Sequence, residues 1–232
     1  MVPVKDKMTT PLCEKAYDYV SRMLMRGELA PGAKLSERAL SAACGVSRVP
    51  MREAIARLVE EGALFQKSQS GTYVSTLTRR DLVEIYEVRE AIECRQTRAA
   101  VARMTDADRR KFADHAERQR RIADAFTASG APLLKGRAEQ DFLAHDFAQH
   151  LLLLRAAGNG YAEKIVATAY RRNRFFGLHS HRRDADHVTR TCADHELLTR
   201  AVLAGNADAA EAAMREHIRH SMADALAQFD RA

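Results

Sequence analysis

The spacing of apolar residues along the chain changes near residue 77. Up to about Thr76, apolar positions follow a helical period in short stretches broken by Gly and Pro, and a pair of strand-like segments follows them. From about Thr78 onward the 3.6-residue period continues through one long segment after another. The sequence therefore predicts a small N-terminal domain of short helices and an all-helical C-terminal domain.

In the N-terminal part the pattern predicts helices over about 12–26, from Ser36 through Ala43, and over 48–61. Ser36 and Ser47 stand where a side chain caps a helix, Gly45 breaks the second helix, and Pro50 falls in the first turn of the third. Two short helices joined by a tight turn are typical of a helix-turn-helix. Residues 63–66 and 72–75 are strand-like, and the polar, Gly-containing segment 67–71 between them indicates a hairpin, or wing.

The C-terminal part is predicted to form an antiparallel bundle of helices over roughly 79–103, 106–127, 133–156, 161–181, 187–204 and 207–229. Thr105 with Asp108 resembles a capping box, Gly158-Asn159-Gly160 breaks one helix, and Gly205-Asn206 ends another. The expected fold class is mainly α. The expected domains are a tail (1–11), a winged helix-turn-helix (12–76), a linker (77–82) and a helical effector-binding domain (83–232).

Composition narrows the class of protein less than the pattern does. The 232 residues carry a formal net charge of +6 and a pI near 9.3, which is compatible with nucleic acid but common among other proteins. The N-terminus has no apolar signal-peptide region, and no apolar run reaches the roughly 18–20 residues of a membrane span. The four cysteines are far apart and contain no CxxC pair, so we expect a cytoplasmic protein with reduced thiols.

The first turn of the third helix carries the candidate DNA-reading residues Ser47, Arg48, Val49 and Arg52. Arg48 and Arg52 are four residues apart and share one face, where a guanidinium can bind guanine or a phosphate through two hydrogen bonds. An isolated RxxxR pair is more often a solvated helix surface. Gly71 would let the wing backbone approach a sugar-phosphate edge closely.

The surrounding pattern closely resembles the winged-helix domain of the GntR regulator family, over about fifty residues. The matching positions are Gly27, Leu29, Pro31-Gly32, Leu35-Ser36-Glu37, Leu40, Gly45-Val46-Ser47-Arg48, Pro50, Arg52-Glu53-Ala54, Leu58, Glu61-Gly62, Gly71 and Val74. Met51 and Ile55 are conservative variants of the usual aliphatic residues. The resemblance implies DNA contacts at Arg38, Ser47, Arg48, Arg52 and Gly71.

In the C-terminal domain, four polar residues fall on or beside apolar helix stripes. Asp146 and His150 are four apart on one helix, and His195 and His217 lie on two later helices. A lone core-facing histidine is more often a hydrogen-bonded structural residue than a ligand. A buried carboxylate with converging imidazoles is nevertheless costly unless the groups are paired or bind a metal.

This half resembles the FCD domain, the FadR-like branch of the GntR family, over roughly 145 residues. Its hallmarks appear as Arg89 with Glu93, Asp146 with His150, Gly158-Asn159, His195, Gly205 and His217. The resemblance implies a divalent metal bound by Asp146, His150, His195 and His217. Gln149 departs from the family, which usually has an aromatic residue before the histidine, and we expect this change to affect packing more than coordination.

Three neutral imidazoles and one carboxylate around a divalent zinc, manganese or nickel ion leave a charge of about +1 and, in octahedral geometry, two open positions. A carboxylate, alone or with an adjacent hydroxyl, would fill them. Arg89 faces the same core and could hold the acid's far end, although a structural salt bridge with Glu93 is an equally good explanation. The other arginines of the region are expected on a solvated face, although one could line the pocket: Arg171, Arg172, Arg174, Arg182 and Arg183.

Together these patterns predict a homodimeric regulator, a repressor of a catabolic operon, that binds a pseudo-palindromic operator and senses a small organic acid. A regulator whose signal is the metal itself is a second interpretation. A metal-dependent enzyme is a third, because such a site can activate water. The sequence has no HExxH motif and no paired ExxH motifs, which disfavours the enzyme.

Overall fold

The computed structural model describes residues 10–177 and 183–231, without the side chains of 173–177. These residues form two compact units: 10–77 and 171–177 make up the first, and 78–170 and 183–231 make up the second. None of the described helices is long and apolar enough to cross a membrane.

The first unit is a winged helix-turn-helix, as predicted. Helices α1 (Pro11–Met25), α2 (Glu37–Cys44) and α3 (Arg48–Glu60) precede the strands β1 (Leu64–Lys67) and β2 (Gly71–Val74). The two strands pair antiparallel, with Leu64 opposite Val74. Compared with the predicted ranges, β1 is shifted one residue later and β2 one residue earlier. An isolated bridge between Lys34 and Tyr73 extends this small sheet.

Local sequence explains the geometry of the helix pair. The Ser36 hydroxyl accepts a hydrogen bond from the Ala39 amide at 3.2 Å and so caps α2. Gly45 ends α2 with φ +69°, a left-handed conformation that favours glycine. Pro50 is buried in the first turn of α3, where its missing N–H leaves no helix bond unmade. The apolar faces of α1, α3 and β1 form one core, whose fully buried members include Ala16, Val20, Met51, Ile55, Leu58 and Leu64.

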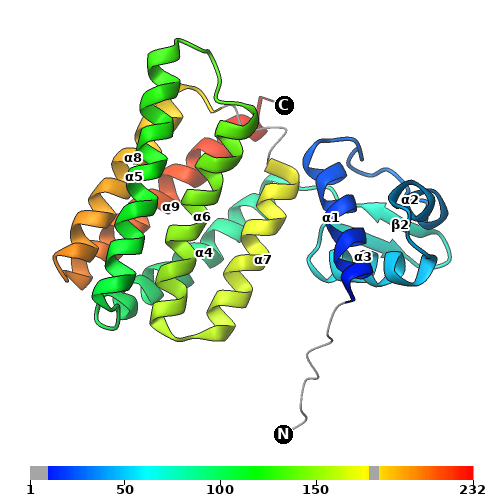
Figure 1. The fold of residues 1–232 in the computed structure, drawn as a ribbon, viewed down its shortest axis with the longest axis horizontal. Coiled ribbons are helices and arrows are strands. Elements are labelled where there is room, and N and C mark those ends of the chain that lie inside the picture. The colour runs from blue at the N-terminus through cyan, green and yellow to red at the C-terminus, as the bar shows by residue number, and fades with distance from the viewer. Residues whose placement is uncertain (1–9, 178–182, 232) are drawn as a thin grey trace, which may run out of the picture. The chain divides into compact units, whose positions relative to one another are not determined.

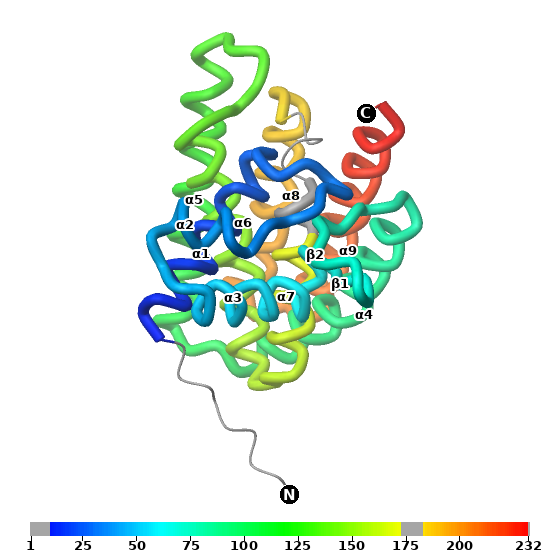
Figure 2. The backbone as a smooth tube through the Cα atoms, turned by 90° about the vertical axis from the view of Figure 1, so that its right-hand side faces the viewer, coloured from blue at the N-terminus to red at the C-terminus, as the bar shows by residue number. Residues whose placement is uncertain are grey.

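The second unit is a helical bundle (Figure 1). It contains α4 (Arg79–Val101), α5 (Asp106–Ser129), α6 (Gly136–Ala157), α7 (Gly160–Gly177) as far as Tyr170, α8 (Ala185–Leu203) and α9 (Ala207–Phe229). The main packing pairs close a ring in the order α4, α6, α5, α8, α9 and back to α4. The first and last helices of the bundle, α4 and α9, therefore lie side by side, as the teal and red tubes show (Figure 2).

Capping residues fix where the long helices begin. Thr105 and Asp108 form the predicted capping box at α5, and Thr78 with Asp81 forms a second at α4, which the sequence patterns had not indicated. Helix α4 thus begins at Arg79, inside the segment 77–82 that was expected as a linker. The predicted end of α7 at 181 lies outside the described residues. Large apolar side chains fill the bundle: Phe112, Phe142, Leu153, Leu154, Leu198, Met214 and Ile218 are fully buried.

Candidate metal centre and DNA-contacting surface

The first turn of α3 exposes both polar and apolar side chains to solvent. Ser47 is the N-cap residue, yet its hydroxyl makes no capping hydrogen bond and is available to another partner. Arg48 and Arg52 are exposed, and Val49 keeps 64% of its surface exposed. Arg52 Nε is 3.4 Å from a Glu37 carboxylate oxygen, a long surface contact that a phosphate or base could replace.

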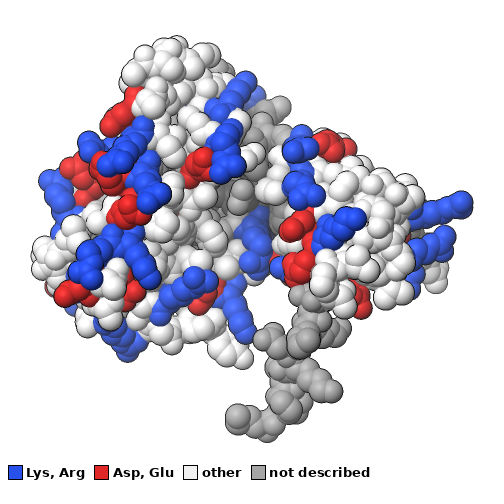
Figure 3. Space-filling model, in the orientation of Figure 1, with Lys and Arg blue, Asp and Glu red and all other residues white. Residues whose placement is uncertain are grey.

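The wing and α2 add further basic groups to this unit. Arg38 is exposed on α2. Gly71 has φ +123°, and a Cβ there would lie 3.0 Å from Lys34 Cε, so the turn and the lysine stem both favour glycine. Lys34 and Lys67, which sequence reasoning did not single out, are exposed beside and within the wing. Lys and Arg side chains project from the right-hand edge of this unit in the space-filling view (Figure 3).

In the second unit, the structure brings together the four residues that the sequence proposed as metal ligands. Asp146 and His150 come from α6, His195 from α8 and His217 from α9. Each offers one ligand atom, and these atoms all lie within 4.8 Å of one another. The three histidines are at most 2% exposed.

Hydrogen bonds at the outer ring nitrogen set the tautomer of His195. Its Nδ1 lies 2.5 Å from Gln119 Oε1, an atom that can only accept, so Nδ1 carries the proton. Gln149 Nε2 donates to the same oxygen at 3.2 Å, and Gln119 Nε2 donates to the Phe142 carbonyl. His195 Nε2 is therefore unprotonated, and it is buried without a hydrogen-bond partner among the described residues. It lies 3.5 Å from Asp146 Oδ1.

His150 is oriented by a buried ion pair. Its Nδ1 donates to Glu93, whose other carboxylate oxygen accepts from Arg89 Nε at 2.7 Å. Arg89 also donates to the Tyr170 hydroxyl at 2.5 Å, and its guanidinium lies 4.0 Å from the centre of that ring. The structural salt bridge between Arg89 and Glu93, one of the two explanations considered for this arginine, is thus present.

His217 contacts His150 across the centre. His217 Nε2 lies 3.2 Å from His150 Nε2. Its Nδ1 is 3.8 Å from Asp194 Oδ2, which is too long for a hydrogen bond, but the carboxylate favours a proton on that nitrogen. With the His217 proton on Nδ1, as Asp194 favours, three unprotonated nitrogens and a carboxylate converge; with that proton on Nε2, His217 donates to His150 instead. The first arrangement is repulsive by itself and becomes favourable around a cation, so the donor set fits a divalent metal ion.

The comparisons with known proteins agree with this architecture. Residues 12–74 match the bacterial regulatory proteins of the gntR family, and residues 84–220 match the FCD domain. The chain belongs to the GntR family. The FCD match covers more than half of the chain, so the expectation of a DNA-binding transcriptional regulator rather than an enzyme is confirmed.

The chain is similar to known transcriptional regulators over most of their length. The chain is 30% identical to the HTH-type transcriptional regulator LutR of Bacillus subtilis, with 84% of this chain and 93% of LutR covered. It is 27% identical to a putative L-lactate dehydrogenase operon regulatory protein of Escherichia coli, with 89% of this chain and 83% of that protein covered. E. coli McbR/YncC shares the fold, with a TM-score of 0.76, 20% identity and coverage of 95% and 99%.

Burial and charge shape the ionisation of the centre in this GntR-family protein. Burial and the nearby His217 hold the pKa of His195 well below its ordinary value, and burial also lowers the pKa of His217 against the pull of Asp194. Burial alone would raise the pKa of Asp146, but the facing imidazoles of His195 and His150 lower it to about 2. His195 and His217 are therefore neutral and the Asp146 carboxyl is ionised near pH 7, which are the forms that bind metal.

Sequence reasoning missed the residues that orient the ligands. Gln119 interrupts the apolar stripe of α5 and is fully buried, and this polar residue in an apolar stripe was a usable signal. Gln149, expected to affect packing, also bonds to Gln119 and lies 3.1 Å from His195 Nδ1. Asp194 directly precedes His195 and carried no signal of its own.

One of the arginines expected on a solvated face is buried instead. Arg183 is 5% exposed, and its Nη1 donates to Glu139 Oε1 at 2.5 Å. Arg183 precedes the first turn of α8 in the sequence, and its backbone carbonyl accepts a hydrogen bond from the Leu134 amide. Arg171 and Arg172 are half-buried, whereas Arg182 and the side chain of Arg174 lie outside the described residues.

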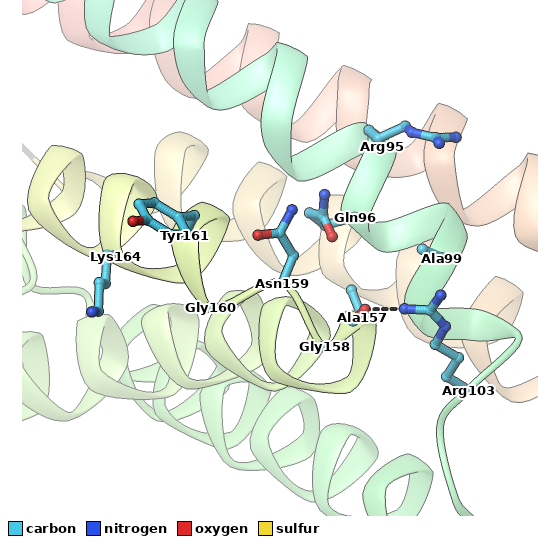
Figure 4. Close-up of a pocket in the computed structure, with 10 residues that line it drawn as sticks. All are labelled: Arg95, Gln96, Ala99, Arg103, Ala157, Gly158, Asn159, Gly160, Tyr161 and Lys164. Atoms are coloured by element: carbon cyan, nitrogen blue, oxygen red, sulfur yellow. Dashed lines mark hydrogen bonds between the residues drawn. The ribbon is translucent and has the colours of Figure 1, made fainter. Parts of the chain in front are cut away.

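A separate groove of about 630 Å³ lies where the end of α4 meets the start of α7 (Figure 4). Arg103 donates to the Ala157 carbonyl at the end of α6 and so closes one side. Lys164 and Tyr161 stand on the α7 side, and Tyr161 is 82% exposed. The groove is open and shares no residue with the metal centre.

The buried histidines give a pH dependence with a definite sign. Because the pKa of His195 and of His217 is lower in the folded than in the unfolded chain, the unfolded chain binds more protons below about pH 6.5. We expect the metal-free protein to lose stability as the pH falls from 7.5 to 5.5, well before Asp146 is protonated. Urea unfolding in the presence of a chelator measures this, and His195→Gln should flatten the slope. An equal slope in both proteins would contradict the assignment.

Proposed function

We propose that this GntR-family regulator holds one divalent metal ion at Asp146, His150, His195 and His217 and responds to a small organic acid bound to that ion. The observation that carries the proposal is the convergence of these four donors within 4.8 Å, with the outer nitrogens of His150 and His195 hydrogen-bonded to protein acceptors. Such partners fix the ring orientation of a metal-bound histidine and increase its basicity. The metal would be zinc, manganese or nickel.

The acid follows from the chemistry of the centre. Three imidazoles and one carboxylate leave about one positive charge on a divalent ion and, in octahedral geometry, two open positions. A 2-hydroxy acid would fill both with a carboxylate and its adjacent hydroxyl oxygen. Arg89 is close enough to lower the pKa of Asp146, and we propose that it also contacts the acid. The lactate operon named for one relative makes L-lactate the first acid to test.

For the acid to regulate, it must bind one conformation of the chain better than another, and the coupling to DNA affinity is then reciprocal. We propose that the DNA site is a pseudo-palindrome read by α3 of each subunit, with Arg48 and Arg52 on base edges or phosphates and Val49 against a thymine methyl. Arg38, Ser47 and Gly71 would support this contact. Repression of a catabolic operon is the regulatory outcome that we propose.

A homodimer would place two reading helices on such a site. The bundle surface beside the groove of Figure 4 offers the apolar area for it: Tyr161 and Ile165 are one turn apart on α7 and are 82% and 46% exposed. We propose that a second copy of the chain covers this face.

A regulator whose signal is the metal itself is the second candidate. It shares the same four ligands but needs no acid, and the buried position of the centre is equally compatible with it.

Elemental analysis and DNA binding test the sensor together. We expect the wild type to carry about one metal ion per chain more than His150→Ala and His195→Ala. Because typical allosteric couplings are about 1–3 kcal/mol, L-lactate should change operator affinity about 5- to 150-fold in the metal-loaded protein only. Propanoate, which lacks the hydroxyl, should act more weakly.

His187→Ala is the matched control, because this histidine bonds to Asp224 away from the centre. Equal metal content in all variants would contradict the metal site. A response of DNA affinity to metal, with none to any acid, would favour the metal-sensing alternative.

Replacing Arg52 by Ala should weaken specific DNA binding about 10- to 100-fold, because a base-reading arginine contributes roughly 1–3 kcal/mol. DNA selected from a random library provides the site, and fluorescence anisotropy measures the affinity. Arg22→Ala, which removes an exposed arginine of α1, should leave the affinity nearly unchanged. Comparable losses in the two variants would rule out a specific role for Arg52.

Tyr161→Asp should convert the dimer into a monomer, because it places a charge in a surface that we expect to be buried between copies. Light scattering should then give a mass near 25.9 kDa instead of twice that value. Leu197→Asp changes another exposed apolar residue, on α8 and 53% exposed, and should remain dimeric. A wild type that is monomeric at micromolar concentration would exclude the proposed interface.

A further inference from the structure

A second pair of histidines meets between α5 and α6, apart from the four-ligand centre. His115 of α5 and His145 of α6 place their Nδ1 atoms 2.9 Å apart, with ring centres 5.2 Å apart. Both side chains are half-buried, so solvent and ions reach them. His145 directly precedes Asp146 in sequence, but its ring contacts α5.

The distance between the two nitrogens suits a shared metal ion. Two imidazole nitrogens bound at about 2.0–2.1 Å and separated by an angle of about 90° at the metal lie about 2.9 Å apart. The same distance fits a single N–H···N hydrogen bond, so the surroundings must decide between the two. A right-angled pair of imidazoles is typical of square-planar or octahedral coordination, which copper(II) and nickel(II) favour.

Carboxylates surround the pair on both helices. Asp141 lies one turn before His145 on α6, and Asp114 directly precedes His115 on α5. Both attract a positive charge at the His145 ring, against the larger opposing effect of Arg118, which is paired with Asp114 at 2.8 Å. Among the described residues the Asp141 carboxylate pairs with Arg137, whose side chain is 85% exposed, and a surface ion pair of this kind contributes little stability. Asp141 can therefore turn toward a cation at little cost.

We propose that His115 and His145, with Asp141 as a third ligand, form a second metal site that takes a late divalent transition metal such as nickel. The ion joins α5 to α6 on the outside of the bundle. Its donor set is separate from Asp146, His150, His195 and His217, so it does not depend on the proposed sensor. Its half-exposed position makes it the more exchangeable of the two sites.

Equilibrium dialysis against nickel chloride at pH 7.5, followed by elemental analysis, tests the second site. We expect His115→Ala and His115→Asn to bind one nickel ion fewer per chain than the wild type. His187→Ala should bind as much as the wild type, because its partner Asp224 lies elsewhere. His195→Ala, in which only the first centre is damaged, should still show thermal stabilisation by nickel, and adding His115→Asn should abolish that shift.

The asparagine variant keeps a hydrogen-bonding side chain and guards against loss of folding, which circular dichroism checks. Unchanged nickel content in both His115 variants would overturn the proposal, as would a thermal shift that survives in the His115→Asn/His195→Ala protein. Equal nickel content in His195→Ala and the wild type would instead contradict the four-ligand centre, so the two proposals can fail separately.

Discussion

The position of a proton on each buried imidazole is the constraint on which the centre of the bundle depends. A proton on the outer nitrogen of His195 requires the Gln119 acceptor, and a proton on the outer nitrogen of His150 requires Glu93. These partners come from α5 and α4, whereas the ligands come from α6, α8 and α9. All five helices of the closed ring are thus needed to point the inner nitrogens at one place. The ring topology is therefore a condition for the chemistry as well as for the core.

The sequence was sufficient to predict that the four proposed ligands lie together, because their positions are periodic. Asp146 and His150 share a face through their four-residue spacing, and His195 and His217 fall on apolar stripes of their own helices. The capping signals were equally local, and the Thr105 capping box and the Gly45 helix end appear where they were expected. Short-range rules act within one helix, so one sequence is enough to apply them.

The contacts that cross from one helix to another could not be predicted in the same way. Which carboxylate or amide meets an outer nitrogen depends on the rotation and offset of packed helices, which the apolar period defines only to within a turn. Gln149 was therefore expected to matter for packing, although it also bonds to Gln119. Arg183 was expected at the surface because its neighbours are arginines, but its pairing with Glu139 of α6 allows it to be buried.

The residues that accept the outer N–H groups of His150 and His195 differ in charge, and this makes the two imidazoles unequal as electron donors. Glu93 is an anion whose pKa is lowered to about 2, since Arg89 and His150 outweigh its burial, whereas Gln119 is a neutral amide. An anionic acceptor pushes electron density into the imidazole that donates to it, so His150 is the stronger electron donor and His195 the weaker one. A metal held between them would be bound more firmly on the α6 side, and the bond to α8 would be the softer of the two. An anionic ligand that donates electron density to such an ion would then weaken the His195 bond before the His150 bond.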